Sequence, residues 1–263
     1  MKKSEKQLSL SVLMTAFNRE KYIGEAIESV LESTFKNFEL IIVDDCSIDS
    51  TIKIARKYET LDSRVKVYVN EKNLGDYPNR NRAASLAKGK YIKYVDSDDI
   101  IYPSCLETMF NSMEKLAGNV GLACGHYQKK PLPVKLNPIE SYYQHFNGGG
   151  LFGRSPLSAI IKKDYFEKIG GFSNERMVSD FEFWFRSGLD TGIVCLQDGM
   201  QWSREHDGQE VVDKHFYTKR YQEIEFNYLM KSKSIFNDEE HKIIVKKYKS
   251  SILKNKLRQF LKF

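Results

Sequence analysis

Three carboxylates stand together in the first half of the chain, in the run Asp96-Ser97-Asp98-Asp99, directly after the apolar segment Tyr91–Val95. At an extended strand end alternate residues point to the same side, so we expect Asp96 and Asp98 to converge. A hard divalent cation, Mg²⁺ or Mn²⁺, would relieve their repulsion and keep open positions for phosphate oxygens. The alternative is that these acids are solvated and cap the helix that Pro103 begins. The strand before them favours the metal site.

Two more chain segments place polar groups just after an apolar strand. Asp44 ends the run Phe38–Asp44 and Asp45 follows it directly. Because neighbouring residues alternate faces, only one of the two can face a given pocket. That carboxylate could accept the N–H of a pyrimidine base, or both could be turn acids. The first strand ends in Thr15-Ala16-Phe17-Asn18, which offers backbone groups and an aromatic ring for a base, or simply a turn and a helix cap.

Strands and helices alternate over residues 1–127 and must position these groups. Apolar, β-branched runs predict strands at Leu8–Met14, Phe38–Asp44, Val65–Val69, Tyr91–Val95 and Val120–Cys124. Helical spacing predicts helices at Tyr22–Leu31 with Asn18 as N-cap, at Ile52–Tyr58, at Asn79–Lys88 and from Pro103. Such alternation predicts an α/β fold with a mostly parallel sheet covered on both faces, and ligands at the carboxyl ends of its strands.

The second half of the chain has a different pattern. Prolines break the alternation after about Lys129, helices are predicted near Asp164–Ile169 and over Asp180–Ser187, and a strand at Ile193–Leu196. We therefore divide the chain into a ligand-binding half at 1–127, a second half of the same domain at 128–210, and a basic helical extension at 211–263.

Charge is unevenly spread along the chain. The chain has 41 Lys and Arg against 35 Asp and Glu, and residues 241–263 hold eight of the basic residues and none of the acids. The rest is slightly acidic, which argues against nucleic acid as a partner. The stripe Ile244, Tyr248 and Ile252, and the adjoining stripe Leu253, Leu257, Phe260 and Leu261, make this segment amphipathic. It could bind an anionic membrane surface or pack on the body.

Cysteine spacing and hydropathy bear on the compartment. The four cysteines are far apart and form no CxxC pair, which argues against a zinc cluster or a disulfide scaffold. The apolar runs are too short for a signal peptide core or a membrane span. We expect a cytoplasmic protein, with the inner face of the membrane as the alternative location.

Four segments of the N-terminal half together resemble the inverting glycosyltransferases of family 2, which have the GT-A fold. They are Ser11–Asn18 with Glu20, Phe38–Ser47, Asn73-Leu74-Gly75 with Arg80-Asn81, and Gly89–Asp99. The resemblance implies a Rossmann-like central sheet flanked by helices. It implies that Asp98 binds the Mn²⁺ or Mg²⁺ that bridges a diphosphate. The nucleotide-sugar would contact Thr15, Ala16, Phe17, Asn18, Glu20, Asp45, Asn73, Arg80 and Asp96.

The segment Ser179–Arg186 is similar to the catalytic segment of that family, and the resemblance implies that Asp180 is the general base. The family commonly has Glu-Asp where this chain has Ser179-Asp180. Asp180 could instead cap a helix, whose dipole would lower its pKa, so basicity would require desolvation by Phe181 or Trp184.

Arg204-Glu205-His206 resembles the Arg-x-His element of the family, which implies that His206 is a second metal ligand. The alternative is a structural or exposed histidine. Trp202 and Trp184 are candidates for stacking on the acceptor sugar, and Trp202 could instead be a core residue.

The expected function is transfer of a sugar from a nucleoside-diphosphate sugar, with UDP the favoured nucleotide, to an acceptor hydroxyl. The resemblance suggests cell-surface polysaccharide or glycan assembly, with a glycan or lipid-linked acceptor. Two alternatives remain at this point. A nucleotidyltransferase would also use strand-end acids and a metal, and a non-catalytic peripheral-membrane scaffold could keep the same fold.

Overall fold

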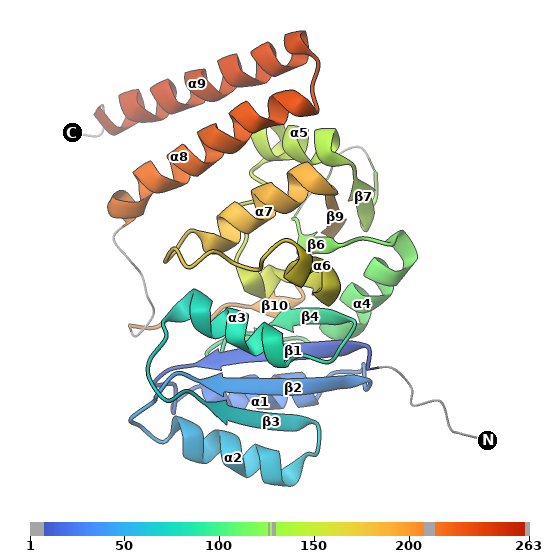
Figure 1. Ribbon diagram of the computed structural model, residues 1–263, viewed down its shortest axis with the longest axis vertical. Coiled ribbons are helices and arrows are strands. Elements are labelled where there is room, and N and C mark those ends of the chain that lie inside the picture. The colour runs from blue at the N-terminus through green and yellow to red at the C-terminus, as the bar shows by residue number, and fades with distance from the viewer. Residues whose placement is uncertain (1–7, 126, 128–129, 208–213, 261–263) are drawn as a thin grey trace.

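The computed structural model describes residues 8–125, 127, 130–207 and 214–260 (Figure 1). Its centre is an eight-stranded sheet in the order β3-β2-β1-β4-β8-β6-β9-β7. The strands are β1 (Leu10–Ala16), β2 (Phe38–Asp44), β3 (Val65–Val69), β4 (Tyr91–Tyr94), β6 (Val120–Ala123), β7 (Val134–Leu136), β8 (Ala159–Lys162) and β9 (Ile193–Leu196). Two further short strands, β5 (Ile100–Ile101) and β10 (Gln201–Trp202), form an antiparallel pair of their own.

Helices cover both faces of the sheet. They are α1 (Ile23–Leu31), α2 (Thr51–Leu61), α3 (Asp76–Leu86), α4 (Cys105–Leu116), α5 (Pro138–Gly148), α6 (Lys163–Lys168), α7 (Ser179–Asp190), α8 (Lys214–Lys231) and α9 (Asp238–Phe260), with short 3₁₀ turns at Pro156–Ser158 and Ser232–Ser234. The expected α/β fold of GT-A type, with helices flanking a central sheet and a helical C-terminus, is confirmed.

The direction of the strands puts the functional candidates at one edge. Strands β3, β2, β1 and β4 are mutually parallel, so the residues that follow β1, β2 and β4 all lie at the same edge of the sheet. The second half is mixed, because β8 runs antiparallel to both β4 and β6 and β7 runs antiparallel to β9. The mostly parallel arrangement therefore holds in the first half.

Alternate residues of the central strands pack on opposite faces. Leu13 of β1 belongs to a large core with α3, α5 and the helices that follow, whereas Val12 and Met14 belong to a core with α1, α2 and α4. The runs are apolar on both faces because both faces are covered.

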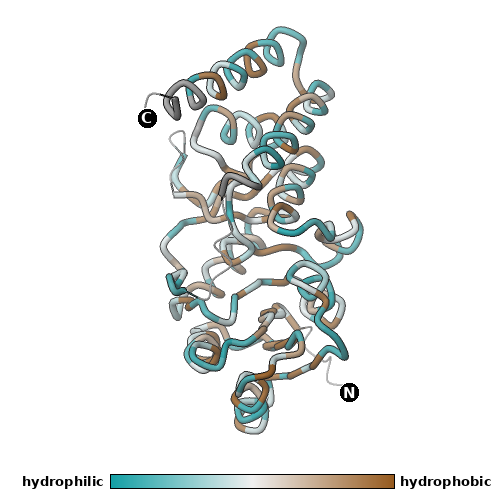
Figure 2. The backbone as a smooth tube through the Cα atoms, turned by 90° about the vertical axis from the view of Figure 1, so that its left-hand side faces the viewer, coloured by the Kyte–Doolittle hydropathy of each residue, from teal (hydrophilic) through white to brown (hydrophobic). Residues whose placement is uncertain are grey.

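The C-terminal helices α8 and α9 form a hairpin against this body (Figure 1). Figure 2 shows both hydrophobic (brown) and hydrophilic (teal) residues in the C-terminal hairpin. Ile244 and Tyr248 of α9 are buried in the large core, so the first predicted stripe packs on the body. Of the second stripe, only the side chain of Leu253 is described, and it is 60% exposed. Across the described residues, we find no helix that combines the length and the apolar character needed to cross a bilayer.

The start of α1 differs from the prediction. Asn18 is not its N-cap, because the helix begins at Ile23 and Arg19 provides the carbonyl that accepts the N–H groups of Tyr22 and Ile23. Asn18 has a left-handed φ of 52°, and its side-chain oxygen accepts the N–H of Ile48 at 3.0 Å. The side chain is thus used to join two loops.

Candidate active site

The acidic run after β4 lies beside a histidine that is distant in the sequence. Asp98 Oδ2 lies 3.1 Å from His206 Nε2 and accepts a hydrogen bond from Arg19 Nε at 2.8 Å. Asp98 and His206 are the two residues that we expected to hold a metal. The fold brings them into direct contact across 108 positions of the sequence.

The short β5–β10 pair makes this contact. Trp202 pairs with Ile100, directly after the acidic run, so the chain that follows β10 returns to it. The N–H of Arg204 then donates to Asp99 Oδ1 at 2.9 Å, which fixes the returning segment. Burial raises the pKa of Asp99 to about 7, and the neighbouring carboxylates of Asp96 and Asp98 add to the rise. Asp99 is therefore an anchor for this segment and not a helix cap.

Aromatic rings support the histidine. The ring of His206 lies 4.4 Å from that of Tyr22, between centroids, and the Arg204 guanidinium lies 5.1 Å from the Tyr22 ring and 4.9 Å from the Trp202 ring. Trp202 is 44% exposed, so its ring is accessible at the rim of the site. Its role in acceptor binding stays a prediction.

Asp96 has a different partner from Asp98. Its Oδ1 lies 2.7 Å from Arg80 Nη2, and Arg80 Nε also binds Asp76 at 2.7 Å. Arg80 is only 9% exposed, and its Nη1 has no hydrogen-bond partner among the described residues. A buried guanidinium nitrogen without a partner can donate a hydrogen bond to a ligand oxygen.

Asp180 lies in the first turn of α7, close to α3, the helix that carries Arg80. Its carboxylate accepts the hydroxyl of Tyr77, on α3, and the N–H of Phe181 at 2.7 Å. Burial raises its pKa to about 6, although those two hydrogen bonds and the charge of Arg80 act to lower it. Asp180 keeps part of its surface accessible, and the N-cap of α7 is Val178, so Asp180 is not the cap.

Trp184 corrects one expectation. Its side chain is fully buried in the large core, and its indole N–H donates to the carbonyl of Arg154 at 2.7 Å. No face of this ring is open to a sugar, so stacking of an acceptor on Trp184 is wrong for this structure. The residue packs α7 against the body.

The expected nucleoside contacts lie around the ends of β1 and β2. Ala16 is buried, Thr15 is partly exposed and Phe17 is 45% exposed, so Phe17 offers an open ring. Glu20 Oε2 accepts the N–H of Ser50 at 2.9 Å, which joins the loop after β1 to the start of α2.

Asp45 and Asn73 already serve the protein itself. Asp45 accepts the N–H groups of Leu74 and Gly75 at 2.8 and 2.9 Å and the side-chain amide of Asn70 at 2.5 Å. Asn73 also accepts the N–H of Gly75, at 3.0 Å. A base would have to share an oxygen of Asp45 that is in use, so the nucleoside contact of this residue stays a prediction.

Two residues of the site were absent from the sequence predictions. Arg19 binds Asp98, and Tyr77 binds Asp180. The only available signal for Arg19 was its position directly after Asn18, at the end of the first strand. Nothing in the sequence around Tyr77 distinguished it from a core tyrosine.

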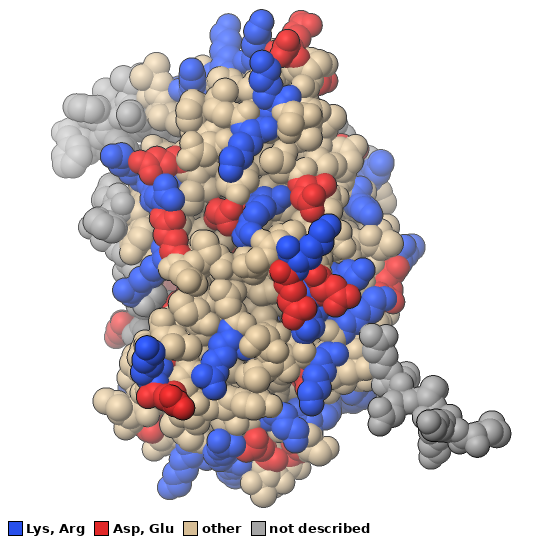
Figure 3. All heavy atoms as spheres, viewed as in Figure 1, with Lys and Arg blue, Asp and Glu red and all other residues tan. Residues whose placement is uncertain are grey.

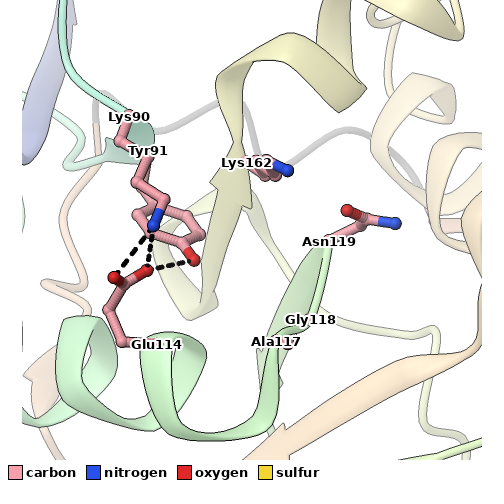
Figure 4. Close-up of a pocket in the computed structure, with 7 residues that line it drawn as sticks. All are labelled: Lys90, Tyr91, Glu114, Ala117, Gly118, Asn119 and Lys162. Carbon is pink, nitrogen blue, oxygen red and sulfur yellow. Dashed lines mark hydrogen bonds and ion pairs between the residues drawn. The ribbon is translucent and has the colours of Figure 1, made fainter.

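Metal ligands are sparse in the part of the chain that is described. It contains no cluster of three or more His, Cys, Asp or Glu side chains suited to a metal ion, so Asp98 and His206 form a pair. A small hollow of about 160 Å³ lies near Lys90, Glu114 and Lys162 (Figure 4). It lies at the other end of β4, away from Asp98, and Lys90 and Tyr91 there bind Glu114.

The sequence of the chain is similar to those of known glycosyltransferases. Residues 11–170 match the model of "Glycosyl transferase family 2". The chain is 29% identical over 218 residues to the glycosyltransferase GlyG of Streptococcus pneumoniae, covering 76% of this chain and 71% of GlyG. It is 42% identical over 193 residues to an uncharacterized glycosyltransferase of Methanocaldococcus jannaschii, covering 67% and 63%. The chain thus spans less than two thirds of the second relative.

A solved structure shares the fold of this chain over most of its length. Residues 1–349 of S. aureus TarS superimpose with a TM-score of 0.69 at 22% identity, covering 91% of this chain and 70% of that one. TarS has also been solved in complex with UDP-GlcNAc and with UDP. At this identity the likeness concerns the fold.

Proposed function

The chain belongs to glycosyl transferase family 2, and from this membership we propose that it moves a sugar from a nucleoside-diphosphate sugar to an acceptor hydroxyl with inversion of the anomeric centre. One observation carries the proposal. Asp98 and His206 meet at the carboxyl edge of the sheet. Beside them, α3 contacts both remaining acids, because its Arg80 pairs with Asp96 and its Tyr77 donates a hydrogen bond to Asp180. Ligands of open α/β sheets bind at this edge.

The donor set of this pair fits a divalent cation. A carboxylate oxygen and an imidazole nitrogen are ligands for Mn²⁺, and the carboxylate also suits Mg²⁺. With two protein ligands, a cation held there would be free to bind further oxygen ligands from a diphosphate or from water. A metal there would stabilise the negative charge on the leaving diphosphate. Asp98 and His206 would hold it, and Arg80 Nη1 would bind a donor oxygen.

Asp180 is the proposed general base. With a pKa of about 6, its carboxylate is ionised at neutral pH and still basic enough to take a proton from a hydroxyl as the bond to the sugar forms. The hydroxyl oxygen attacks the anomeric carbon, the glycosidic bond to the diphosphate breaks, and the proton passes to Asp180. Attack opposite the leaving group gives inversion.

We propose UDP as the nucleotide. The family resemblance and the TarS complexes with UDP and UDP-GlcNAc support this choice. The uracil and ribose would lie near Thr15–Asn18, with Phe17 offering the exposed ring and Glu20, Asp45, Asn73 and Asp96 shaping the loops around it.

The acceptor is proposed to be a cell-surface glycan or its lipid-linked precursor. Five lysines of α9 are exposed: Lys242, Lys246, Lys247, Lys249 and Lys254. Ile243 and Leu253, on the same helix, are 47% and 60% exposed. Lys and Arg side chains gather at the top of the face shown in Figure 3, over the C-terminal hairpin. Each lysine near an anionic membrane can add about 1 kcal/mol. We propose that this lysine face holds the enzyme at the inner surface of the membrane.

The test is metal-dependent release of nucleoside diphosphate. A panel of sugar nucleotides is offered with glycan and membrane-lipid acceptors and Mn²⁺, and the anomeric configuration of the product is read by NMR. We expect release from at least one UDP-sugar and an inverted product. A retained configuration would contradict the single displacement. Diphosphate released from a nucleoside triphosphate would favour a nucleotidyltransferase, and vesicle binding without any release would favour a scaffold.

A further inference from the structure

Asp98 is already neutralised by a cation of the protein. Its Oδ2 receives both Arg19 Nε and His206 Nε2, and the three side chains are 13%, 22% and 8% exposed. A carboxylate in such a setting is costly without a partner. Arg19 supplies that partner from the loop after β1, 79 positions earlier in the sequence.

The backbone of Arg19 is fixed while its side chain reaches across the site. Its N–H donates to Thr51 Oγ1 at 2.7 Å, and its carbonyl accepts the N–H of Ile23 at the start of α1. Its Nη1 donates to the carbonyls of Phe17 and Asn18 at 3.1 and 3.2 Å. The guanidinium therefore lies over the end of β1, between the proposed nucleoside loop and Asp98.

A divalent cation and a guanidinium compete for the same carboxylate. Two positive charges at contact distance repel each other, and Oδ2 of Asp98 cannot serve both as a close hydrogen-bond acceptor of Arg19 and as a ligand without that repulsion. A metal bound to this carboxylate would therefore weaken the contact between Arg19 and Asp98. A guanidinium at this edge of the sheet has a natural new partner in a phosphate, whose oxygens match its planar set of donors.

We propose that Arg19 is an exchangeable counter-ion. It neutralises Asp98 while the donor is absent, and it transfers its hydrogen bonds to a phosphate oxygen of the nucleoside diphosphate when a divalent cation takes Asp98. This inference rests on the proposed function of the same site. Its consequence is that Arg19 opposes binding of a metal alone and favours binding of metal and diphosphate together, so the two ligands bind cooperatively.

The test measures two affinities in Arg19→Gln, which removes the charge and keeps a polar side chain. Mn²⁺ alone is titrated and followed by electron paramagnetic resonance, and UDP is titrated in saturating Mn²⁺ by calorimetry. We expect Mn²⁺ alone to bind more tightly and UDP with Mn²⁺ more weakly, each by about tenfold, the lower end of the scale of one hydrogen bond to a charged group. Arg19→Lys should lie between the two proteins in both titrations.

Arg56→Gln is the matched control, because Arg56 is exposed on α2 and pairs with Glu59 at the surface. It should leave both affinities unchanged, and thermal melts should show that all variants fold. The opposite signs of the two effects are the diagnostic result. If Arg19→Gln weakens both ligands or changes neither, the exchange is wrong. If the wild-type protein itself fails to bind UDP in Mn²⁺, the proposed function of the site fails.

Discussion

At the residue scale, two opposing effects set the chemistry of Asp180. The dipole of α7 and the hydrogen bonds from Tyr77 and Phe181 favour the charged carboxylate, and burial disfavours it. Burial is the largest effect, so the pKa rises to about 6. The carboxylate is then ionised at neutral pH but remains a stronger base than an exposed aspartate.

Asp180→Asn should remove turnover and increase stability. Loss of a general base costs about 10²- to 10⁴-fold in rate. The pKa of Asp180 is about 6 in the folded protein and 3.8 in the unfolded chain. The free energy of unfolding of the wild type therefore falls as pH rises between these two values, and it does not recover above pH 6. Asparagine avoids this loss, so the free energy of unfolding at pH 7 should rise by about 1 to 3 kcal/mol.

Urea denaturation at pH 4 to 8 measures that difference. The gap between Asp180→Asn and wild type should widen up to about pH 6 and then stay constant. Asp164→Asn, at an exposed acid of α6, is the control and should change neither turnover nor stability. A variant that keeps full turnover would remove Asp180 from the base role.

Tyr77→Phe should shift the pH dependence of the reaction. The hydroxyl of Tyr77 lowers the pKa of Asp180, so its removal should raise that pKa by roughly half a unit to one unit. The rising limb of kcat/KM against pH, with its midpoint near 6 in the wild type, should move to higher pH. An unmoved or lower midpoint would show that Tyr77 does not act on the base.

The site residues predicted from the sequence are those that stand in a short segment with a recognisable pattern. Asp98, Asp180 and His206 each stand in a short segment with a recognisable pattern. Arg19 and Tyr77 do not, because their significance comes from Asp98 and Asp180, which are 79 and 103 positions away along the chain. The burial of Trp184 was also missed, because the sequence of a helix does not by itself show which aromatic side chains face the core.

At the element scale, periodicity predicts most of the long segments, although not α5, and misses the short ones. The strands and helices around the first sheet edge occur in the expected order, with boundaries shifted by a few residues, because both faces of the sheet are covered and the strands are strongly apolar. The pair β5 and β10 has only two residues per strand and no periodicity to detect. That pair nevertheless brings His206 to Asp98.

The lysine face of α9 can be tested as a unit. The triple variant Lys242→Glu, Lys246→Glu, Lys249→Glu should lose binding to vesicles containing anionic phosphatidylglycerol, because about 1 kcal/mol per lysine is removed and repulsion is added. Co-sedimentation with vesicles measures binding. The buried contacts of Ile244 and Tyr248 lie on the other side of the helix, so folding should be retained.

A triple variant with the same Lys→Glu change at Lys53, Lys57 and Lys66 controls for net charge. These three lysines are exposed on α2 and β3. The control variant should bind the vesicles as the wild type does. Equal loss in the two triple variants would mean that overall charge and not α9 determines the interaction. Unchanged binding in the α9 variant would contradict the proposed membrane surface.

At the scale of the whole molecule, one sheet serves two tasks. Its parallel half gathers the loops after β1, β2 and β4 at one edge, and its mixed half, through α7 and β10, brings Asp180 and His206 to that edge. The excess positive charge lies in the C-terminal segment, whereas the site holds acids that are paired with Arg19 and Arg80. A metal with a diphosphate would therefore enter a site that is electrostatically balanced beforehand.

Thermal unfolding with and without donor tests the central claim most directly. With a UDP-sugar at about 100 times its Kd and Mn²⁺ present, the wild-type protein should gain about 2.7 kcal/mol, or roughly 5 to 10 °C in Tm. Asp180→Asn should keep this shift, and Asp98→Ala should lose its Mn²⁺-dependent part. If no sugar nucleotide stabilises the wild type in Mn²⁺, or if Asp98→Ala keeps the full shift, the assignment of this site is contradicted.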